Sequence, residues 1–365
     1  MILKTGILTF HRCINYGSYW QAVCLARYLQ TLGHQVEILD HQSRKVDLAE
    51  WKCALQPVLP THVPVTDYPF YRQKIEKFFD AFDLLPLSRE FSLENPVQMD
   101  EYDLVVVGSD EVWNLSHPWY GHYPIFYGEG LKTNQLISYA ASFGNYDVSW
   151  RLAPEWSQKL RNFDSISVRD ENSQIQIKNA LGYEPVTVLD PCFLHPVKPE
   201  KMEFPIKKPF VALYGHNFSG TFIWQARQWA KKQKLPLVSI GYRNDWADEQ
   251  WLTAGPHEFA SFIAQSEAVI TNFFHGCVFS LINSKPFVCE TTPYRSHKVE
   301  DLLRKTGAAK HIITRETSDK EFRNLLLKPL DLQIHQNITR LRMASQNWLQ
   351  KSVTSPMTVP RYENV

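Results

Sequence analysis

The sequence lacks the features that mark several broad classes of protein. It has no block of lysine and arginine, because 39 basic residues are matched by 38 acidic ones over 365 residues, for a formal charge of +1. It also has no apolar run long enough to span a membrane, since even Leu104–Val107 is followed at once by polar residues. These absences argue against nucleic-acid partners and against a transmembrane segment.

Cysteine is also scarce, and its spacing suggests neither disulfides nor metal binding. The six cysteines include no CxxC pair, and a chain of this length needs no disulfides to fold. No two histidines have the HxxxH spacing of a helical metal site. The first ten residues lack the apolar core and cleavage site of a secretory signal. We therefore expect reduced cysteines, no metal, no cofactor and a cytoplasmic protein.

Apolar residues make up 44% of the chain, which is enough to bury a core in each of two or three domains. The N-terminal part alternates short apolar runs with helical patterns, beginning with a run at Thr5–Phe10, a helix that Gly33 ends, and a run at Gln35–Asp40. This order predicts a βαβ unit in a parallel sheet covered on both faces. Further strands are predicted at Asp103–Val107, Leu136–Ala140, Ser165–Val168 and Val186–Leu189.

A second α/β series follows a change of composition near residue 195, where prolines alternate with lysines as in a linker between domains. We therefore divide the chain into residues 1–195, 196–325 and 326–365, the last holding a helix that crosses back and a frayed end. Prolines between Pro57 and Pro69 predict an irregular connection. Strands are predicted at Phe210–Tyr214, Leu237–Ile240, Ala268–Thr271 and Pro286–Cys289, and helices at Phe222–Lys232, Pro256–Gln265, His275–Asn283 and Ile334–Trp348.

Polar residues directly follow several of the predicted strands, and ligands of open α/β sheets bind beyond the carboxyl ends of strands. In the C-terminal part, Asn272–Gly276 joins a strand to a helix, which places His275 near helix N–H groups that favour an anion. In the N-terminal part, the corresponding polar residues are Asn15, Tyr16, Gly17, Gln21, Ser109, Asp110, Glu111, Trp113, Asn114 and Ser142.

These segments resemble, in the same order, six motifs of the polysaccharide pyruvyl transferase family. The matching segments are Gly6–Phe10 with Asn15–Gly17 and Gln21-Ala22, Val107–Asn114, Ser138–Gly144, Ser167–Asp170, Leu189–Pro191, and Thr271–Gly276 with Val278–Ser280. The resemblance implies an α/β fold similar to GT-B enzymes, with two Rossmann-like domains whose parallel sheets face a central cleft.

The resemblance also implies a reaction. Enzymes of this family transfer the enolpyruvyl group of phosphoenolpyruvate to two hydroxyls of a saccharide, forming a cyclic pyruvate ketal and phosphate in polysaccharide biosynthesis. Phosphoenolpyruvate is then the donor substrate, and the partner is a free or lipid-linked saccharide, through which any membrane contact would be peripheral. The chemistry needs a proton for the methylene carbon, a base for the hydroxyls, and donors for a carboxylate and a phosphate.

By this resemblance, His275 is the general acid and Asp110 is the base or the anchor of an acceptor hydroxyl. Arg169 would bind the donor anion, together with Asn272, Phe274, Gly276 and Arg295. The acceptor would bind to Asn15, Tyr16, Gly17, Gln21, Ser109, Glu111, Trp113, Asn114 and Ser142.

Two positions depart from the family pattern. Some branches carry Arg-Leu before the histidine, whereas Phe273-Phe274 stand here and supply no charge. The charge would then come from Arg12, His216, Arg295 or Lys298. Glu111 stands in place of the usual glutamine, where it serves as a second acid/base or repels an anionic acceptor.

Structural roles are the alternatives at these positions. His275 would then satisfy a helix terminus, Arg169 would pair with neighbouring acids, and Asp110 and Asn15 would cap helices. Two other functions also fit the pattern: group transfer from a nucleotide-activated donor on the same scaffold, and saccharide binding without catalysis.

Overall fold

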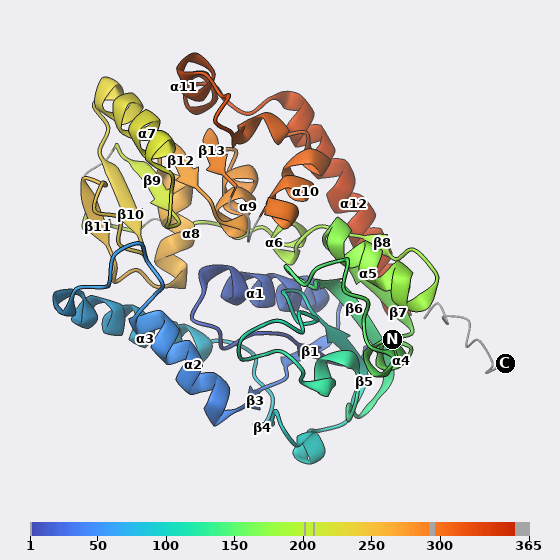
Figure 1. Ribbon diagram of the computed structural model, residues 1–365. Helices are drawn as coiled ribbons and strands as arrows, with labels where there is room; N and C mark the ends of the chain where they lie inside the picture. The colour runs from blue at the N-terminus through green and yellow to red at the C-terminus, as the bar shows by residue number, and fades with distance from the viewer. Residues whose placement is uncertain (1, 201, 207–208, 292–295, 355–365) are drawn as a thin grey trace.

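The computed structural model describes residues 2–200, 202–206, 209–291 and 296–354. The N-terminal half is built on a parallel sheet with the strand order β2-β1-β5-β6-β7-β8 (Figure 1). Its central strands are nearly continuous apolar runs because they are buried on both faces. The strands are β1 (Lys4–Leu8), β2 (Gln35–Ile38), β5 (Tyr102–Val107), β6 (Thr133–Ala141), β7 (Ser165–Val168) and β8 (Val186–Thr187).

The helices of this half include one pair, α2 and α3, that extends from the sheet toward the C-terminal half (Figure 1). The first helix, α1, begins where the Asn15 side chain accepts hydrogen bonds from the N–H groups of Gly17 and Ser18. A small parallel pair, β3 (His41–Gln42) and β4 (Phe91–Ser92), lies apart from the main sheet. The helices are α1 (Tyr16–Thr31), α2 (Arg44–Leu55), α3 (Tyr68–Phe82), α4 (Pro154–Leu160), α5 (Glu171–Leu181) and α6 (Pro191–Leu194), with 3-10 turns at Val65–Asp67, Pro96–Gln98 and Pro124–Tyr127.

The C-terminal half repeats this plan with the strand order β11-β10-β9-β12-β13-β14, again parallel throughout. Its strands are β9 (Val211–Tyr214), β10 (Leu237–Ile240), β11 (Glu249–Trp251), β12 (Ala268–Thr271), β13 (Phe287–Glu290) and β14 (Ile312–Ile313). Its helices are α7 (Gly220–Gln233), α8 (Pro256–Gln265), α9 (Phe274–Ile282), α10 (Ser296–Thr306) and α11 (Asp319–Leu327), with a 3-10 turn at Ala309–His311. Two parallel sheets of this kind, in one chain and with both sets of strand ends lining one cavity, form a GT-B-like α/β fold, as the sequence predicts.

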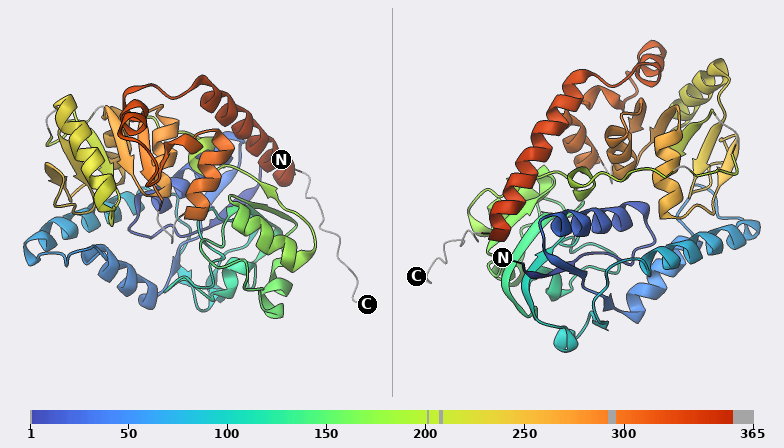
Figure 2. Two further views of the ribbon diagram at one scale, coloured as in Figure 1. Left: turned by 45° about the horizontal axis from the view of Figure 1, so that its top comes forward. Right: turned by 180° about the vertical axis from the view of Figure 1, so that it is seen from behind.

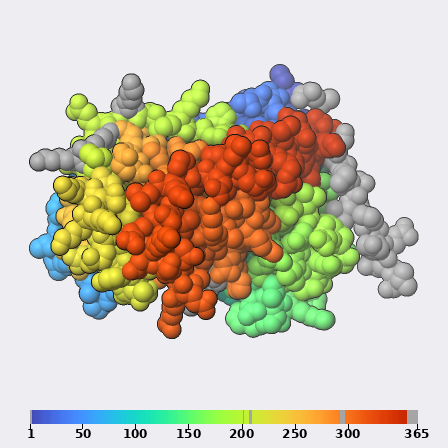
Figure 3. Space-filling view, turned by 90° about the horizontal axis from the view of Figure 1, so that it is seen from above, coloured from blue at the N-terminus to red at the C-terminus, as the bar shows by residue number. Residues whose placement is uncertain are grey.

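The last helix, α12 (Leu332–Thr354), runs from the C-terminal half back to the N-terminal half (Figure 2). Figure 3 shows its red surface reaching the green and blue surface of the N-terminal half. At the far end, the carbonyl of Ser352 accepts a 2.6 Å hydrogen bond from Gln135, and Trp348 packs near the ring of Tyr139. None of the helices described is both long enough and apolar enough to cross a membrane.

The two halves share one continuous hydrophobic core where α1 and α3 meet α8. Tyr16 of α1 stacks on Phe259 with 4.4 Å between ring centroids, and its hydroxyl donates a 2.7 Å hydrogen bond to the carbonyl of Ala254. At the start of α3, Arg243 forms a 2.8 Å ion pair with Asp67. Apolar packing and buried hydrogen bonds therefore fix the position of one sheet relative to the other.

The sequence predicts the strands of both sheets except β11 and β14, and it predicts long amphipathic helices, but it misses several shorter elements. The irregular connection predicted from the prolines is wrong at its end, because Pro69 lies in the first turn of α3. Proline is tolerated there because the N–H group it lacks has no partner in a helix anyway. Unpredicted elements include α2, α5, α10 and β11.

Candidate active site

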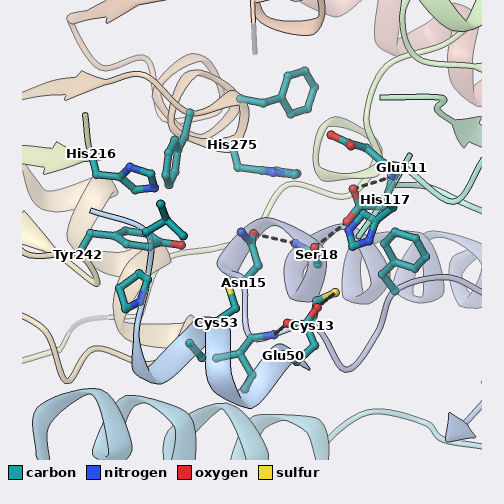
Figure 4. Close-up of a pocket in the computed structure, with 18 of the residues that line it drawn as sticks. Cys13, Asn15, Ser18, Glu50, Cys53, Glu111, His117, His216, Tyr242 and His275 are labelled. Atoms are coloured by element: carbon teal, nitrogen blue, oxygen red, sulfur yellow. Dashed lines mark hydrogen bonds between the residues drawn. The ribbon is translucent and has the colours of Figure 1, made fainter. Parts of the chain in front are cut away.

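A cavity of about 790 Å³ lies between the halves, and its walls come from the carboxyl ends of strands in both sheets. The strand order reverses between β1 and β5 in one sheet and between β9 and β12 in the other, and ligands of such sheets bind at the point of reversal. Residues that follow β1, β5, β7, β9, β10 and β12 line the cavity, among them Asp110, Arg169 and Phe274. Figure 4 shows others of this set: Asn15, Ser18, Glu111, His216, Tyr242 and His275.

His275 projects from the first turn of α9, just after β12, and enters the cavity from the C-terminal half (Figure 4). Its ring lies against Gly17 of the N-terminal half, so closely that a Cβ atom at Gly17 would be 1.8 Å from the histidine Nδ1. Gly276 has a related role in α9, because a Cβ atom there would collide with Thr271. Glycine at these two positions lets the helix and its histidine approach closely.

Asp190, at the start of α6, connects His275 to Arg169. Its Oδ2 lies 3.5 Å from His275 Nε2 and 3.3 Å from Arg169 Nη1, while its Oδ1 accepts a hydrogen bond from the N–H of Cys192. Burial alone would raise the pKa of Asp190, but His275 and Arg169 outweigh it and lower the pKa to about 2. A buried carboxylate thus stands behind both the histidine and the arginine of the cavity.

Arg169 is buried and also faces Asp110, with Nη2 3.3 Å from its Oδ1. The Phe274 ring covers the guanidinium group, at 5.0 Å from the ring centroid. Asp110 accepts a 2.6 Å hydrogen bond from Ser18 at its other oxygen. The predicted catalytic residues Asp110 and His275 and the predicted anion-binding residue Arg169 therefore line the same cavity, with Asp190 and Ser18 bound to them.

Glu111 and Lys298 form an ion pair at the cavity wall, and the Glu111 carboxylate also accepts a 3.0 Å hydrogen bond from Asn114. The pair crosses from the loop after β5 to α10, so Lys298 supplies a positive charge to the cavity from the C-terminal half. Arg295, for which the sequence predicts such a role, lies outside the described residues.

Several residues predicted to bind substrate are placed elsewhere. Trp113 is buried in the core, where its indole donates to the carbonyl of Phe126. Ser142 donates to Asp170, and Gln21 donates to Thr9 and to the carbonyl of Ser18. Tyr16 packs between the halves, as described above. These side chains shape the loops around the cavity and do not line it, and the same holds for Ser109, Asn114, Gly276 and Asn272.

The sequence also allows Asn15 and Asp110 to be helix caps, and the structure confirms this for Asn15 only. Asn15 does cap α1 through its side-chain oxygen, and it also lines the cavity. Asp110 caps no helix: the residues after it form turns, and the next helical segment of the described chain is the 3-10 turn at Pro124–Tyr127.

Three further residues in or beside the cavity are not predicted as site residues from the sequence. Asp190 gives a signal, because Leu189-Asp190-Pro191 follows a predicted strand in the way that Asp110 does. Lys74 and Glu50 give none, because they lie on helices, α3 and α2, where a charged residue looks like solvent-exposed surface. Glu50 is nevertheless buried, and it accepts hydrogen bonds from Trp119 and from the N–H of Ile14.

Among the described residues, Asp190, Cys192 and His275 form one group close enough to share a metal ion. The group suits a cation poorly. Burial raises the pKa of the Cys192 thiol well above its usual range, so the thiol stays protonated. Asp190 already faces the guanidinium of Arg169, which would repel a metal cation.

The family model for polysaccharide pyruvyl transferases matches residues 15–292 of the chain. No curated protein matches this chain significantly. Similar solved structures include a Listeria monocytogenes protein assigned as a UDP-N-acetylglucosamine 2-epimerase, with 11% identity, full coverage of both chains and a TM-score of 0.55. A UDP-GlcNAc 2-epimerase from Methanocaldococcus jannaschii has 12% identity and a TM-score of 0.51, covering 94% of this chain and 100% of that one. At such identities these structures share the fold alone.

Proposed function

Because the chain belongs to the polysaccharide pyruvyl transferase family, we propose that it transfers the enolpyruvyl group of phosphoenolpyruvate to two hydroxyls of a saccharide. The observation that carries the proposal is the arrangement of His275, Asp190 and Arg169 around the cavity. It places a histidine backed by a carboxylate beside a buried arginine, and the proposed chemistry needs a proton donor beside an anion-binding group.

The reaction balances with no cofactor. A proton adds to the methylene carbon of phosphoenolpyruvate, and one saccharide hydroxyl attacks the adjacent carbon. The bond from that carbon to the phosphate oxygen then breaks, and the second hydroxyl attacks the same carbon. Of the two hydroxyl protons, one ends in the new methyl group and the other on the phosphate that leaves. The protein therefore has to move two protons and hold two anionic groups.

The residues of the cavity divide these tasks. His275 protonates the donor, and the Asp190 carboxylate, 3.5 Å from its Nε2, orients the imidazole ring. Asp110 accepts the proton of the attacking hydroxyl, and its bond from Ser18 holds it in place. Arg169 binds the carboxylate or the phosphate of the donor. In the structure its guanidinium group lies 3.3 Å from both Asp110 and Asp190, and a substrate anion can replace these long contacts with shorter ones.

The missing arginine before His275 is compensated in two ways in this proposal. Phe274 covers the guanidinium of Arg169 and shields it from water, which strengthens its attraction for an anion. Lys298 supplies the second positive charge from α10.

Donor binding tests the proposal without knowledge of the acceptor. Calorimetry should show saturable binding of phosphoenolpyruvate to the wild type, and Arg169→Ala should abolish it. His275→Ala should bind the donor but lose turnover on the order of 10²-fold or more in an acceptor screen. Arg304→Ala is a matched control, because it removes an exposed arginine of α10 that pairs with Glu171 and Asp301 outside the cavity.

Other outcomes would favour the two other functions. The Methanocaldococcus jannaschii epimerase has also been solved with UDP-GlcNAc and UDP. Binding of a nucleotide sugar, with none of phosphoenolpyruvate, would indicate group transfer from a nucleotide-activated donor. Binding of a saccharide with no turnover from either donor would indicate a non-catalytic saccharide-binding protein.

A further inference from the structure

One lysine of the cavity has no role in the reaction proposed above. Lys74 of α3 is only 2% exposed, yet it lines the cavity. Its ammonium group donates a 3.0 Å hydrogen bond to the carbonyl of Gly241 and lies 5.1 Å and 4.9 Å from the ring centroids of Tyr71 and Tyr242. An ammonium group has three N–H donors, so its bonding capacity is not filled by this carbonyl.

Lys74 also lacks an anionic partner within the described part of the chain. No carboxylate there forms an ion pair with it, whereas Lys77, on the next turn of the same helix, pairs with Glu258. Burial lowers the pKa of Lys74 to about 8, which expresses the cost of keeping this charge out of water. An anion bound in the cavity beside Lys74 would offset that cost.

The surroundings of Lys74 are those of a ligand site in an α/β sheet. Tyr242 follows β10 and His216 follows β9, so both stand at the carboxyl ends of adjacent strands, and β9 is one of the two strands between which the strand order reverses. Their ring centroids are 5.2 Å apart. Figure 4 shows His216 and Tyr242 on one side of His275, with Glu111 and His117 on the other.

The geometry points to an anion subsite, formed by Lys74 with Tyr242 and His216, that binds a phosphate or diphosphate group carried by the acceptor saccharide. The inference rests on the proposed function in one respect. That function assigns the donor anions to Arg169 and Lys298, and the latter pairs with Glu111 on the opposite side of His275. The acceptor is then the substrate that reaches Lys74.

Such a phosphate has two sources, a soluble sugar phosphate and a lipid-linked sugar diphosphate. The residues of the cavity wall help to decide between these sources. Ala54 near the end of α2 lines the cavity, as do Pro57 and Val58 of the connection between α2 and α3. The Val58 side chain is exposed. A lipid-linked acceptor would cover the Val58 side chain, whereas a soluble sugar phosphate would leave it in water.

Calorimetry at saturating phosphoenolpyruvate tests the subsite, with inorganic pyrophosphate and geranyl diphosphate as probes. The wild type should bind pyrophosphate, Lys74→Met should bind it roughly ten-fold to hundred-fold more weakly, and Lys74→Arg should restore much of the loss. Lys77→Met is the matched control and should bind as the wild type does. Tighter binding of geranyl diphosphate than of pyrophosphate would identify the lipid-linked source, and equal binding the soluble one.

The outcomes separate this inference from the proposed function. Unchanged pyrophosphate binding by Lys74→Met would overturn the subsite, and so would a loss of phosphoenolpyruvate binding as large as that of Arg169→Ala, because Lys74 would then serve the donor. If the wild type binds no phosphoenolpyruvate but binds pyrophosphate through Lys74, the proposed function fails while the anion subsite stands.

Discussion

Lys298 and Glu111 form an ion pair that joins the two halves of the molecule across the cavity wall. Burial would raise the pKa of Glu111, but the charge of Lys298 outweighs it and lowers the pKa to about 2. The carboxylate is therefore ionised at any physiological pH, and it neutralises a cation that the proposed donor site needs.

Replacing Glu111 with glutamine should tighten donor binding. Glu111→Gln keeps the side chain's size and its contact with Asn114 but releases the charge of Lys298, so we expect the Kd for phosphoenolpyruvate to fall roughly ten-fold. Calorimetry measures this, and adding Lys298→Met should reverse the gain. If Glu111→Gln instead leaves the Kd unchanged and lowers kcat, the glutamate acts in acid/base chemistry.

Asp190 should matter for both turnover and acid stability. Asp190→Asn keeps the oxygen that accepts from Cys192 but removes the charge behind His275, so kcat should fall on the order of 10²-fold. The pKa of Asp190 is lowered from 3.8 to about 2 in the folded protein, so its ionised form stabilises the fold above that range. The contribution is lost as the pH falls from about 4 to about 2.

Chemical denaturation of both proteins between these pH values isolates this effect from other carboxylates. The difference in unfolding free energy between wild type and Asp190→Asn should shrink as the pH falls. A difference that stays constant with pH would show that Asp190 has an ordinary pKa.

Gly17 should tolerate no side chain, although alanine favours helices. Gly17→Ala replaces glycine within α1, which alone would stabilise the helix by about 0.5–1 kcal/mol. The new Cβ atom would overlap the imidazole of His275, so we expect kcat to fall on the order of 10²-fold while the helical circular dichroism is retained.

Gly220→Ala is the matched control for this experiment. It lies in the first turn of α7, and nothing stands within 4 Å of a Cβ atom there. It should leave kcat unchanged. Full activity of Gly17→Ala would show that the histidine can work from another position.

Lys74→Met should make the protein more stable. The folded-state pKa of Lys74, about 8, lies below its ordinary 10.5, so the charged form destabilises the fold at pH 7 by about 3 kcal/mol. That cost disappears as the pH rises from about 8 to about 10.5, where the unfolded chain also loses the proton. Thermal denaturation should show a higher Tm for Lys74→Met at pH 7, with a smaller gain at pH 10; an equal Tm at pH 7 would contradict the burial cost.

Much of the fold is predictable from the sequence because its strands are buried on both faces. Segments such as Leu136–Ala140 and Ala268–Thr271 are short apolar runs that end in polar loops, and periodicity detects them. The stripe of Ile75, Phe78 and Phe82 is also enough to predict α3. The α2 helix escapes prediction because its contacts come from other parts of the chain, such as the bond from Trp119 to Glu50. Lys74 and Glu50 are charged residues on helices, and only tertiary packing decides that they face inward.

The candidate site shows the same division. Strand ends identify His275, Asp110 and Arg169, because the chain's local pattern places them at the edge of a sheet. The pattern cannot tell a residue at that edge from one turned into the core. It therefore also predicts substrate contacts for Trp113 and Ser142, whose side chains bond to Phe126 and Asp170. Long-range geometry also decides that Asp190 meets His275.

His275 belongs to the C-terminal half, whereas Asp110, Arg169 and Asp190 come from the segment before residue 195, so neither half holds the reacting groups by itself. The buried contact between Tyr16 and Phe259 aligns these two contributions. Two fragments produced separately, divided near residue 205, would each be inactive, and activity would return only on their reassociation. A substitution of Tyr16 or Phe259 would misalign the two halves, so a genetic screen would find it as a loss of activity although neither residue lines the cavity.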